Sequence, residues 1–297
     1  MRPSSRINLR SAMSQAKQHI ATELTFAELV KAYCAVQFDG ADLRMRKWIE
    51  AFGLESAWKL TTAQISTAAE AMLEHGYRAS TVNRDTSTIG TLYKWALRKR
   101  LAPTGFVSPT LGLQRYEEPI RRVEIKDTEI TALLDGAKAF SDRRFAVLVR
   151  LLVETGARKS EILERRWRDI DLVARSITCA TTKTGRPRAL FFSPASAELM
   201  ARVWPRRWDE GLLFESNIVA GRIINYRRQW QDLTRRIGRP DLNLHDLRHY
   251  RAAELLKAGN TIAVAAQVLG HSSLILQRRY GHLETATLRA ATEASWR

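Results

Sequence analysis

The sequence predicts a mainly helical protein with a small β-sheet, made of an N-terminal helical domain and a C-terminal mixed α+β domain. Three observations predict this. Apolar residues recur at three- and four-residue spacing through most of the chain, a break rich in proline and glycine lies near residues 101–125, and one short run after the break alternates like strands. The 297 residues are enough for two domains that each bury a core.

Helices of the first half are expected at Phe26 to Val36, at Thr62 to Glu74 and, most plainly, at Thr81 to Lys99. The third of these has an apolar stripe: Val82, Ile89, Leu92 and Ala96. Polar residues lie largely on its opposite side: Arg84, Thr88, Thr91, Lys94 and Arg98. That polar side is either a solvated face or a face that grips phosphates, and the helix by itself does not decide between them.

The break contains Pro103, Gly105, Pro109, Gly112 and Pro119, followed by charged residues, and it is expected to be an extended linker. Beyond it, helices are expected at Asp127 to Lys138, Asp142 to Glu154 and Ser160 to Trp167. The run from Ser176 to Ser193 is expected to form a β-hairpin around a turn that contains Gly185, and helices return from about Asn225.

The charge balance points to a polyanionic partner. Lys and Arg number 48 against 31 Asp and Glu, which gives a formal net charge of +17. Nucleic acid is favoured over a membrane surface because no long basic amphipathic helix stands out. A signal peptide or membrane span is not expected, and two distant cysteines, Cys34 and Cys179, favour a reducing, cytoplasmic setting over a disulfide framework or zinc site.

Four short stretches carry residues suited to chemistry on a phosphate. In the first, Gly156 is expected to end a helix in the left-handed conformation, and Ser160 to cap the next helix, with Glu161 in its first turn. Arg158 then lies on a corner between helices. The second stretch is the hairpin tip, where Lys183 is placed on a turn that can reach a docked substrate.

The third stretch holds His245 and Arg248, whose spacing puts them on one helix face. In the fourth, Gly270 is expected to stop a helix, with His271 just beyond its C-terminus, and Tyr280 follows nine positions later. Taken singly, each stretch is a weak signal and is better explained by ordinary surface or junction residues.

Together and in this order, TGARKSE, TKTGRPR, HDLRH, LGHSS and RRYGHL resemble the boxes of the tyrosine recombinases, also called phage integrases. WRDIDL after the first box and the helix that begins TVNRD also resemble the family, whereas Tyr250 is bulkier than the small residue expected there. Only about 20 residues precede the first helix, so the simple two-domain type is favoured over one with an additional arm-binding domain.

The resemblance implies five segments: a tail at 1–19, a helical DNA-clamping domain at 20–112, a linker at 113–125, a catalytic domain at 126–282, and a tail helix at 283–297. In the family such a tail docks on a neighbouring protomer, and docking on its own protomer is the alternative.

The resemblance also implies the chemistry. Tyr280 would attack the scissile phosphate, form a 3′-phosphotyrosyl bond and expel a 5′-oxygen, which Lys183 protonates. Arg158 and Arg248 would hold the non-bridging oxygens. His245 would assist proton transfer near the tyrosine, His271 would hydrogen-bond the phosphate, and Glu161 would support the site rather than react.

No cofactor, ATP or metal is implied. The implied partners are double-stranded DNA and further copies of the chain, in a homotetramer on two DNA sites, with a monomer as an option away from DNA and DNA-bending proteins as accessory factors. Three alternatives stay open at this point: a type IB topoisomerase-like enzyme, a phosphodiesterase and a non-catalytic DNA-binding regulator.

Overall fold

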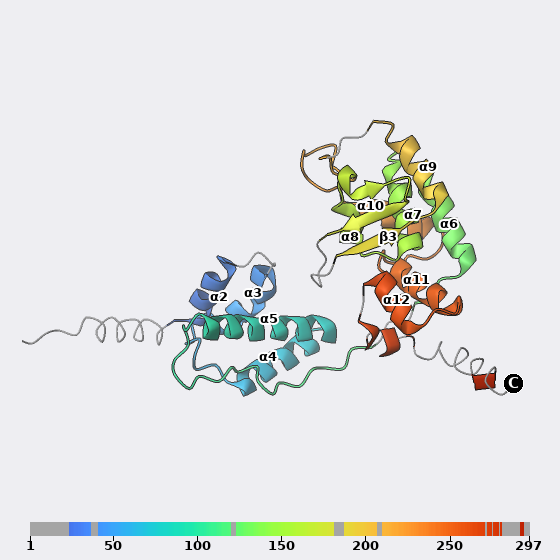
Figure 1. Ribbon diagram of the computed structural model, residues 1–297. Coiled ribbons are helices and arrows are strands. Elements are labelled where there is room, and N and C mark those ends of the chain that lie inside the picture. Colours follow the sequence, from blue (N-terminus) through green and yellow to red (C-terminus); the bar gives the residue numbers. More distant parts are fainter. Residues whose placement is uncertain are drawn as a thin grey trace, which may run out of the picture. The chain divides into compact units, whose positions relative to one another are not determined.

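The computed structural model describes residues 24–36, 41–119, 123–180, 187–206, 210–270, 272–274, 276–278, 280 and 292–293. The chain divides into two compact units, residues 1–120 and 121–297, and each has its own hydrophobic core (Figure 1). Helices dominate both units, and the strands of the described part form one three-stranded antiparallel sheet in the order β1-β2-β3. The predicted fold class is therefore confirmed.

The first unit contains four described helices: α2 (Phe26–Cys34), α3 (Ala41–Phe52), α4 (Thr62–Glu74) and α5 (Ala79–Arg98). Three of them are the predicted ones to within two residues, whereas α3 was not foreseen. Thr25 and Thr61 begin α2 and α4 with capping boxes, in which each threonine hydroxyl accepts from a backbone N–H of the first turn.

The apolar stripe of α5 is buried as predicted, since Val82, Ile89, Leu92 and Ala96 are all inaccessible to solvent. The polar side is narrower than expected, because Thr88 is also buried, with its hydroxyl donating to the carbonyl of Arg84 at 2.9 Å. A threonine can lie in a helix interior in this way because its hydroxyl bonds to the preceding turn.

Residues 101–118 hold no helix or strand, yet part of this segment packs on the first unit. Its apolar side chains cover the core: Leu101, Phe106, Leu113 and Tyr116. The buried amide of Asn83 accepts from the backbone N–H of Tyr116 and donates to its carbonyl, at 3.0 and 2.8 Å. The segment is therefore fastened to α5 by a side chain that satisfies its backbone groups.

The second unit is built around α7 (Arg144–Thr155), in which nine of twelve residues are buried. Around it lie α6 (Asp127–Ala137), α8 (Lys159–Leu163), α9 (Pro194–Val203), α10 (Arg227–Arg236), α11 (Asp246–Lys257) and α12 (Ile262–Leu269) (Figure 1). The sheet consists of β1 (Ile170–Asp171), β2 (Ser176–Cys179) and β3 (Arg188–Phe191). The predicted hairpin is confirmed in β2 and β3, which pair from Ser176↔Phe191 to Cys179↔Arg188.

The helix predicted at Ser160 to Trp167 is shorter than expected. It ends at Leu163, and a 3₁₀ turn, η1 (Trp167–Asp169), follows. The backbone between them bonds across to another segment: Leu213 donates to the carbonyl of Arg165 at 2.8 Å, and Trp167 donates to that of Gly211 at 3.1 Å. Tertiary hydrogen bonds replace the helical ones there.

A smaller apolar cluster joins α11 to α12 and to the helical residues after it. Leu255, Leu256, Ile262 and Leu269 lie in its centre, and the ring of Tyr280 packs against it. The cluster thereby fixes where Tyr280 lies relative to α11. No helix within the described ranges is long and apolar enough to cross a membrane.

Candidate active site

The corner between α7 and α8 has a backbone geometry that favours glycine. Gly156 ends α7 with φ 61° and ψ 20°, the left-handed conformation predicted from the sequence. A Cβ at this position would lie 2.5 Å from Cδ2 of Leu269, so any larger residue would force the Leu269 side chain on α12 to shift. The chain can therefore turn sharply and bring Arg158 to the end of α12.

The cap of α8 differs from the prediction. Arg158, not Ser160, is the residue before the helix, and Ser160 lies inside it. The carboxylate of Glu161 accepts from the backbone N–H of Arg158 at 2.8 Å, and its other oxygen accepts from Nη1 of the same arginine at 2.8 Å. An acidic side chain reaching back from the third helical position thus satisfies the helix start without a serine cap.

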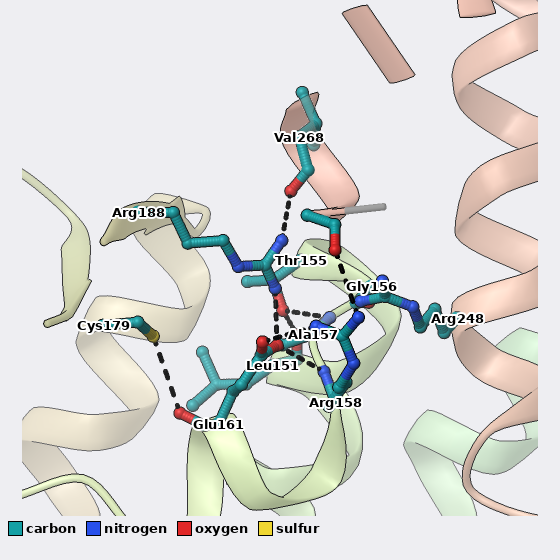
Figure 2. A network of polar contacts seen from close by, with 11 residues as sticks. Leu151, Thr155, Gly156, Ala157, Arg158, Glu161, Cys179, Arg188, Arg248 and Val268 are labelled. Carbon is teal, nitrogen blue, oxygen red and sulfur yellow. Dashed lines mark hydrogen bonds and ion pairs between the residues drawn. The ribbon is translucent and has the colours of Figure 1, made fainter. Parts of the chain in front are cut away.

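Glu161 is the centre of a polar network shown in Figure 2. Besides Arg158, it binds Arg188 of β3, whose Nη2 lies 2.6 Å from Oε2. Burial by itself would raise the pKa of the Glu161 carboxyl. The hydrogen bond from the Arg158 backbone and the charges of Arg188 and Arg158 outweigh burial, so the pKa lies below its ordinary value. Glu161 is therefore an anion that holds two guanidinium groups in place.

Both arginines also bind the end of α12. Nη2 of Arg158 donates to the carbonyl of Gly270 at 3.1 Å, and Nη1 of Arg188 donates to that of Val268 at 2.7 Å. Carbonyl groups in the last turn of a helix lack partners within the helix and are good acceptors for cations. The network therefore ties β3, the α7–α8 corner and α12 together (Figure 2).

Sequence reasoning missed Arg188. A signal for it was available in the hairpin register, because Arg188 pairs with the buried Cys179 and directly opposed residues share a face of the sheet. A charged residue on a buried face needs a counter-ion, and Glu161 supplies it.

Arg248 lies in the first turn of α11 and is only 2% exposed. Its Nη1 donates to the carbonyl of Gly156 at 2.8 Å. Burial first, and then the charges of Arg158 and Arg188, lower its pKa to about 9. Arg158 and Arg188 both bind Glu161, and Arg248 binds the carbonyl of Gly156, two residues before Arg158, so the three guanidinium groups lie in one region.

Tyr280 approaches the same region. Its hydroxyl lies 2.6 Å from Nδ1 of His249, the residue after Arg248 on α11. A negative charge on Tyr280 would raise the pKa of Arg248, which puts the phenol within electrostatic reach of that guanidinium. The expected nucleophile and the two expected arginines are therefore brought together.

The imidazole found on the tyrosine is not the expected one. His245 was expected near Tyr280; it precedes α11, is exposed, and its ring meets that of His249 edge-on with centroids 4.9 Å apart. His249 was not singled out from the sequence, although it belongs to the same HDLRH stretch and lies one helical turn after His245.

Several expectations fall on parts of the chain outside the described residues. These are Lys183 at the hairpin tip, His271, and the tail at 283–297 except for residues 292 and 293. Tyr250, which the sequence marked as unusually bulky, donates its hydroxyl to Asp127 at 2.9 Å and so links α11 to the first turn of α6.

A cleft of about 1190 Å³ opens beside the network. It is bordered by the α7–α8 corner, β3 and α12, and its walls include Arg158, Arg188, Arg251 and Ser272. Fixed donors that line a partly enclosed space bind phosphate oxygens well, because arginine presents a planar pair of N–H groups.

Two family models match the chain. The first, the phage integrase family, matches residues 124–287, which is more than half of the sequence. The chain belongs to the phage integrase family. The second model, the phage integrase N-terminal SAM-like domain, matches residues 42–100 of the first unit.

Known phage integrase relatives agree with this assignment. The chain is 30% identical over 173 residues to the tyrosine recombinase XerA of Saccharolobus solfataricus, a match that covers 57% of this chain and 56% of that protein. It is 26% identical over 262 residues to the tyrosine recombinase XerC of Xanthomonas campestris pv. campestris, which covers 84% of this chain and 78% of XerC. The chain is thus an enzyme of the tyrosine recombinase class, a site-specific DNA recombinase.

Solved structures share the fold. The Tn1549 transposon integrase in complex with a circular intermediate DNA has a TM-score of 0.69 at 18% identity, over 91% of this chain and 99% of that one. A lambda integrase dimer bound to a COC′ core site has a TM-score of 0.61 at 15% identity, over 91% of this chain and 79% of that one. Both are structures of integrases on DNA.

Proposed function

We propose that this recombinase cuts and rejoins DNA strands through a covalent 3′-phosphotyrosyl bond to Tyr280. The observation that carries the proposal is that Arg158, Arg188 and Arg248 lie in one region, with the Tyr280 hydroxyl 2.6 Å from His249, the residue after Arg248. Glu161 supplies one negative charge to these three guanidinium groups, and a backbone phosphate would supply the further negative charge that such a cluster favours.

The arginines would act on the reacting phosphate. Arg158 and Arg248 hold its two non-bridging oxygens and stabilise the negative charge that builds up in the transition state. They also help the nucleophile, because ionising a free tyrosine at pH 7 costs roughly 4 kcal/mol and nearby positive charge lowers that cost. Glu161 orients Arg158 and does not itself react.

Lys183, His271 and His245 complete the proposal. Lys183 protonates the departing 5′-oxygen, His271 hydrogen-bonds the phosphate, and His245 assists the proton transfer near the tyrosine. The phosphotyrosyl bond keeps the energy of the broken link, so a 5′-hydroxyl from a second strand can reverse the step without ATP. Metal ions are not part of this scheme.

The substrate we propose is double-stranded DNA, acted on by four protomers at two sites. The net charge of +17 favours such a polyanion, and binding should weaken steeply as salt rises. A lambda integrase tetramer bound to a Holliday junction has the same fold, with a TM-score of 0.62 at 14% identity, and supports this assembly by analogy.

The experiment is a denaturing gel after incubation with a nicked suicide substrate, which traps protein on DNA. Tyr280→Phe should bind DNA but form no covalent adduct. Tyr250→Phe is the matched control: it removes a hydroxyl from the same unit that donates to Asp127, away from the arginine network, and should still form adduct. An adduct from Tyr280→Phe would remove Tyr280 from its role.

A further inference from the structure

The structure places His249 in direct contact with the proposed nucleophile. Its Nδ1 lies 2.6 Å from the Tyr280 hydroxyl, within the distance of a direct hydrogen bond. His249 projects from α11, and Tyr280 packs on the apolar cluster that α11 shares with α12. The contact is therefore held from both sides by packed helices.

We propose that His249 is the proton acceptor for Tyr280, an inference that rests on the proposed function. A tyrosine that attacks phosphorus must lose its proton, and a general base must lie within about 2.6–3.2 Å of the atom that carries it. Nδ1 meets this requirement when the neutral ring carries its hydrogen on Nε2.

A buried positive charge lies beside His249 on α11. Arg248 precedes His249 on α11 and holds a buried positive charge, with the charges of Arg158 and Arg188 near it. Positive charge in the same region disfavours a second cation beside it. Once the reacting phosphate adds its own negative charge, the imidazolium that forms is no longer opposed to the same degree.

The ring of His249 is also held in its orientation by a neighbouring ring. His245 meets it edge-on, with an interplanar angle of 89° and centroids 4.9 Å apart. Edge-to-face contacts between rings fix the orientation of both partners. His245 thus supports proton transfer through His249.

The step balances. The bond from Tyr280 Oη to phosphorus forms, the bond from phosphorus to the 5′-oxygen breaks, and the tyrosine proton moves to Nδ1 of His249. The leaving oxygen takes its proton from Lys183, as proposed above. In rejoining, the 5′-hydroxyl returns a proton to Lys183, and His249 returns its proton to the tyrosine. The starting protonation of all three side chains is thereby restored without a co-reactant.

The test compares His249→Asn with wild type in single-turnover cleavage of the nicked suicide substrate at saturating enzyme. Asparagine places an amide oxygen close to the Nδ1 position, so it can accept the hydrogen bond but not the proton. General acid–base catalysis contributes on the order of 10²- to 10⁴-fold, and adduct formation should slow by at least about 100-fold with DNA binding little changed. The matched control is His75→Asn in the first unit, where Nδ1 lies 2.8 Å from the Ala71 carbonyl.

A second substrate separates the two proton transfers. With a 5′-bridging sulfur in place of oxygen, the leaving group no longer needs a proton. This substrate should restore cleavage by Lys183→Ala but not by His249→Asn. Equal rescue of both variants, or a His249→Asn rate within about threefold of wild type, would overturn the proposal.

One measurement needs no variant. The ¹⁵N chemical shifts of His249 in the wild-type enzyme should show an unprotonated Nδ1 at neutral pH, and a proton on Nδ1 would overturn the assignment even if the variants failed to fold. The proposed function fails separately: an adduct from Tyr280→Phe would refute it. An inactive Tyr280→Phe beside a normal His249→Asn would refute only the role of His249.

Discussion

Replacing the buried guanidinium of Arg248 by an apolar chain should make the free enzyme more stable while destroying its activity. Burial and the charges of Arg158 and Arg188 lower the pKa of Arg248 to about 9. A decrease of roughly 3 to 4 in pKa, at about 1.4 kcal/mol each, disfavours the charged form by about 5 kcal/mol. Arg248→Met removes that cost, and it also removes the hydrogen bond to Gly156, worth about 1.5–3 kcal/mol.

The net expectation is a gain of about 2 kcal/mol in the free energy of unfolding, within the range of about 1–4 kcal/mol for replacing buried charges by apolar side chains. For a unit of this size it corresponds to roughly 4–8 °C in Tm. Thermal unfolding followed by circular dichroism measures it, and the suicide-substrate gel should show no adduct. Arg235→Met, at an exposed position on α10, is the control and should change stability by less than about 0.5 kcal/mol. A loss of stability for Arg248→Met would refute the reasoning.

Three further predictions concern the residues around the site. Glu161 has a lowered pKa in the folded enzyme, so it stabilises the fold fully above its unfolded pKa, near 4.5, and this contribution is lost as pH falls through the folded value. Acid titration of stability should therefore show a steeper loss below pH 4.5 for wild type than for Glu161→Gln; parallel curves would contradict it. Gly156→Ala should cost about 1–2 kcal/mol for the left-handed backbone plus the clash with Leu269, whereas Gly259→Ala, at φ 84° with open space around it, reports the backbone cost alone. Equal losses in urea unfolding would mean that the corner does not pack as described. Tyr250→Phe should cost about 0.5–1.5 kcal/mol through its lost bond to Asp127 and leave the cleavage rate unchanged; slower cleavage would place Tyr250 in the chemistry.

Features set by local conformation could be predicted from the sequence. Gly156 and Gly270 both end their helices, as expected, and both have the left-handed backbone that favours glycine, which was predicted for Gly156 alone. The boundaries of α4 and the β2–β3 hairpin could also be predicted, because the sequence patterns that indicate them lie within a few residues of each structure.

Features set by contacts between residues far apart in the chain could not be predicted from the sequence. The contact of His249 with Tyr280 joins residues 31 positions apart, and that of Arg188 with Glu161 joins residues 27 positions apart. Ser160 was expected to cap α8 by local rules, but the helix starts after Arg158, and the Glu161 carboxylate accepts from the backbone N–H of Arg158. The resemblance to the family implied an imidazole near the tyrosine, but only the packing of α11 distinguishes His249 from His245.

The account depends most directly on the identity of the attacking atom. Wild-type enzyme trapped on a nicked suicide substrate, digested with nuclease and protease and analysed by tandem mass spectrometry, should carry its residual nucleotide on Tyr280, joined through a 3′-phosphate. A nucleotide on any other residue, or a 5′-linkage, would contradict the account.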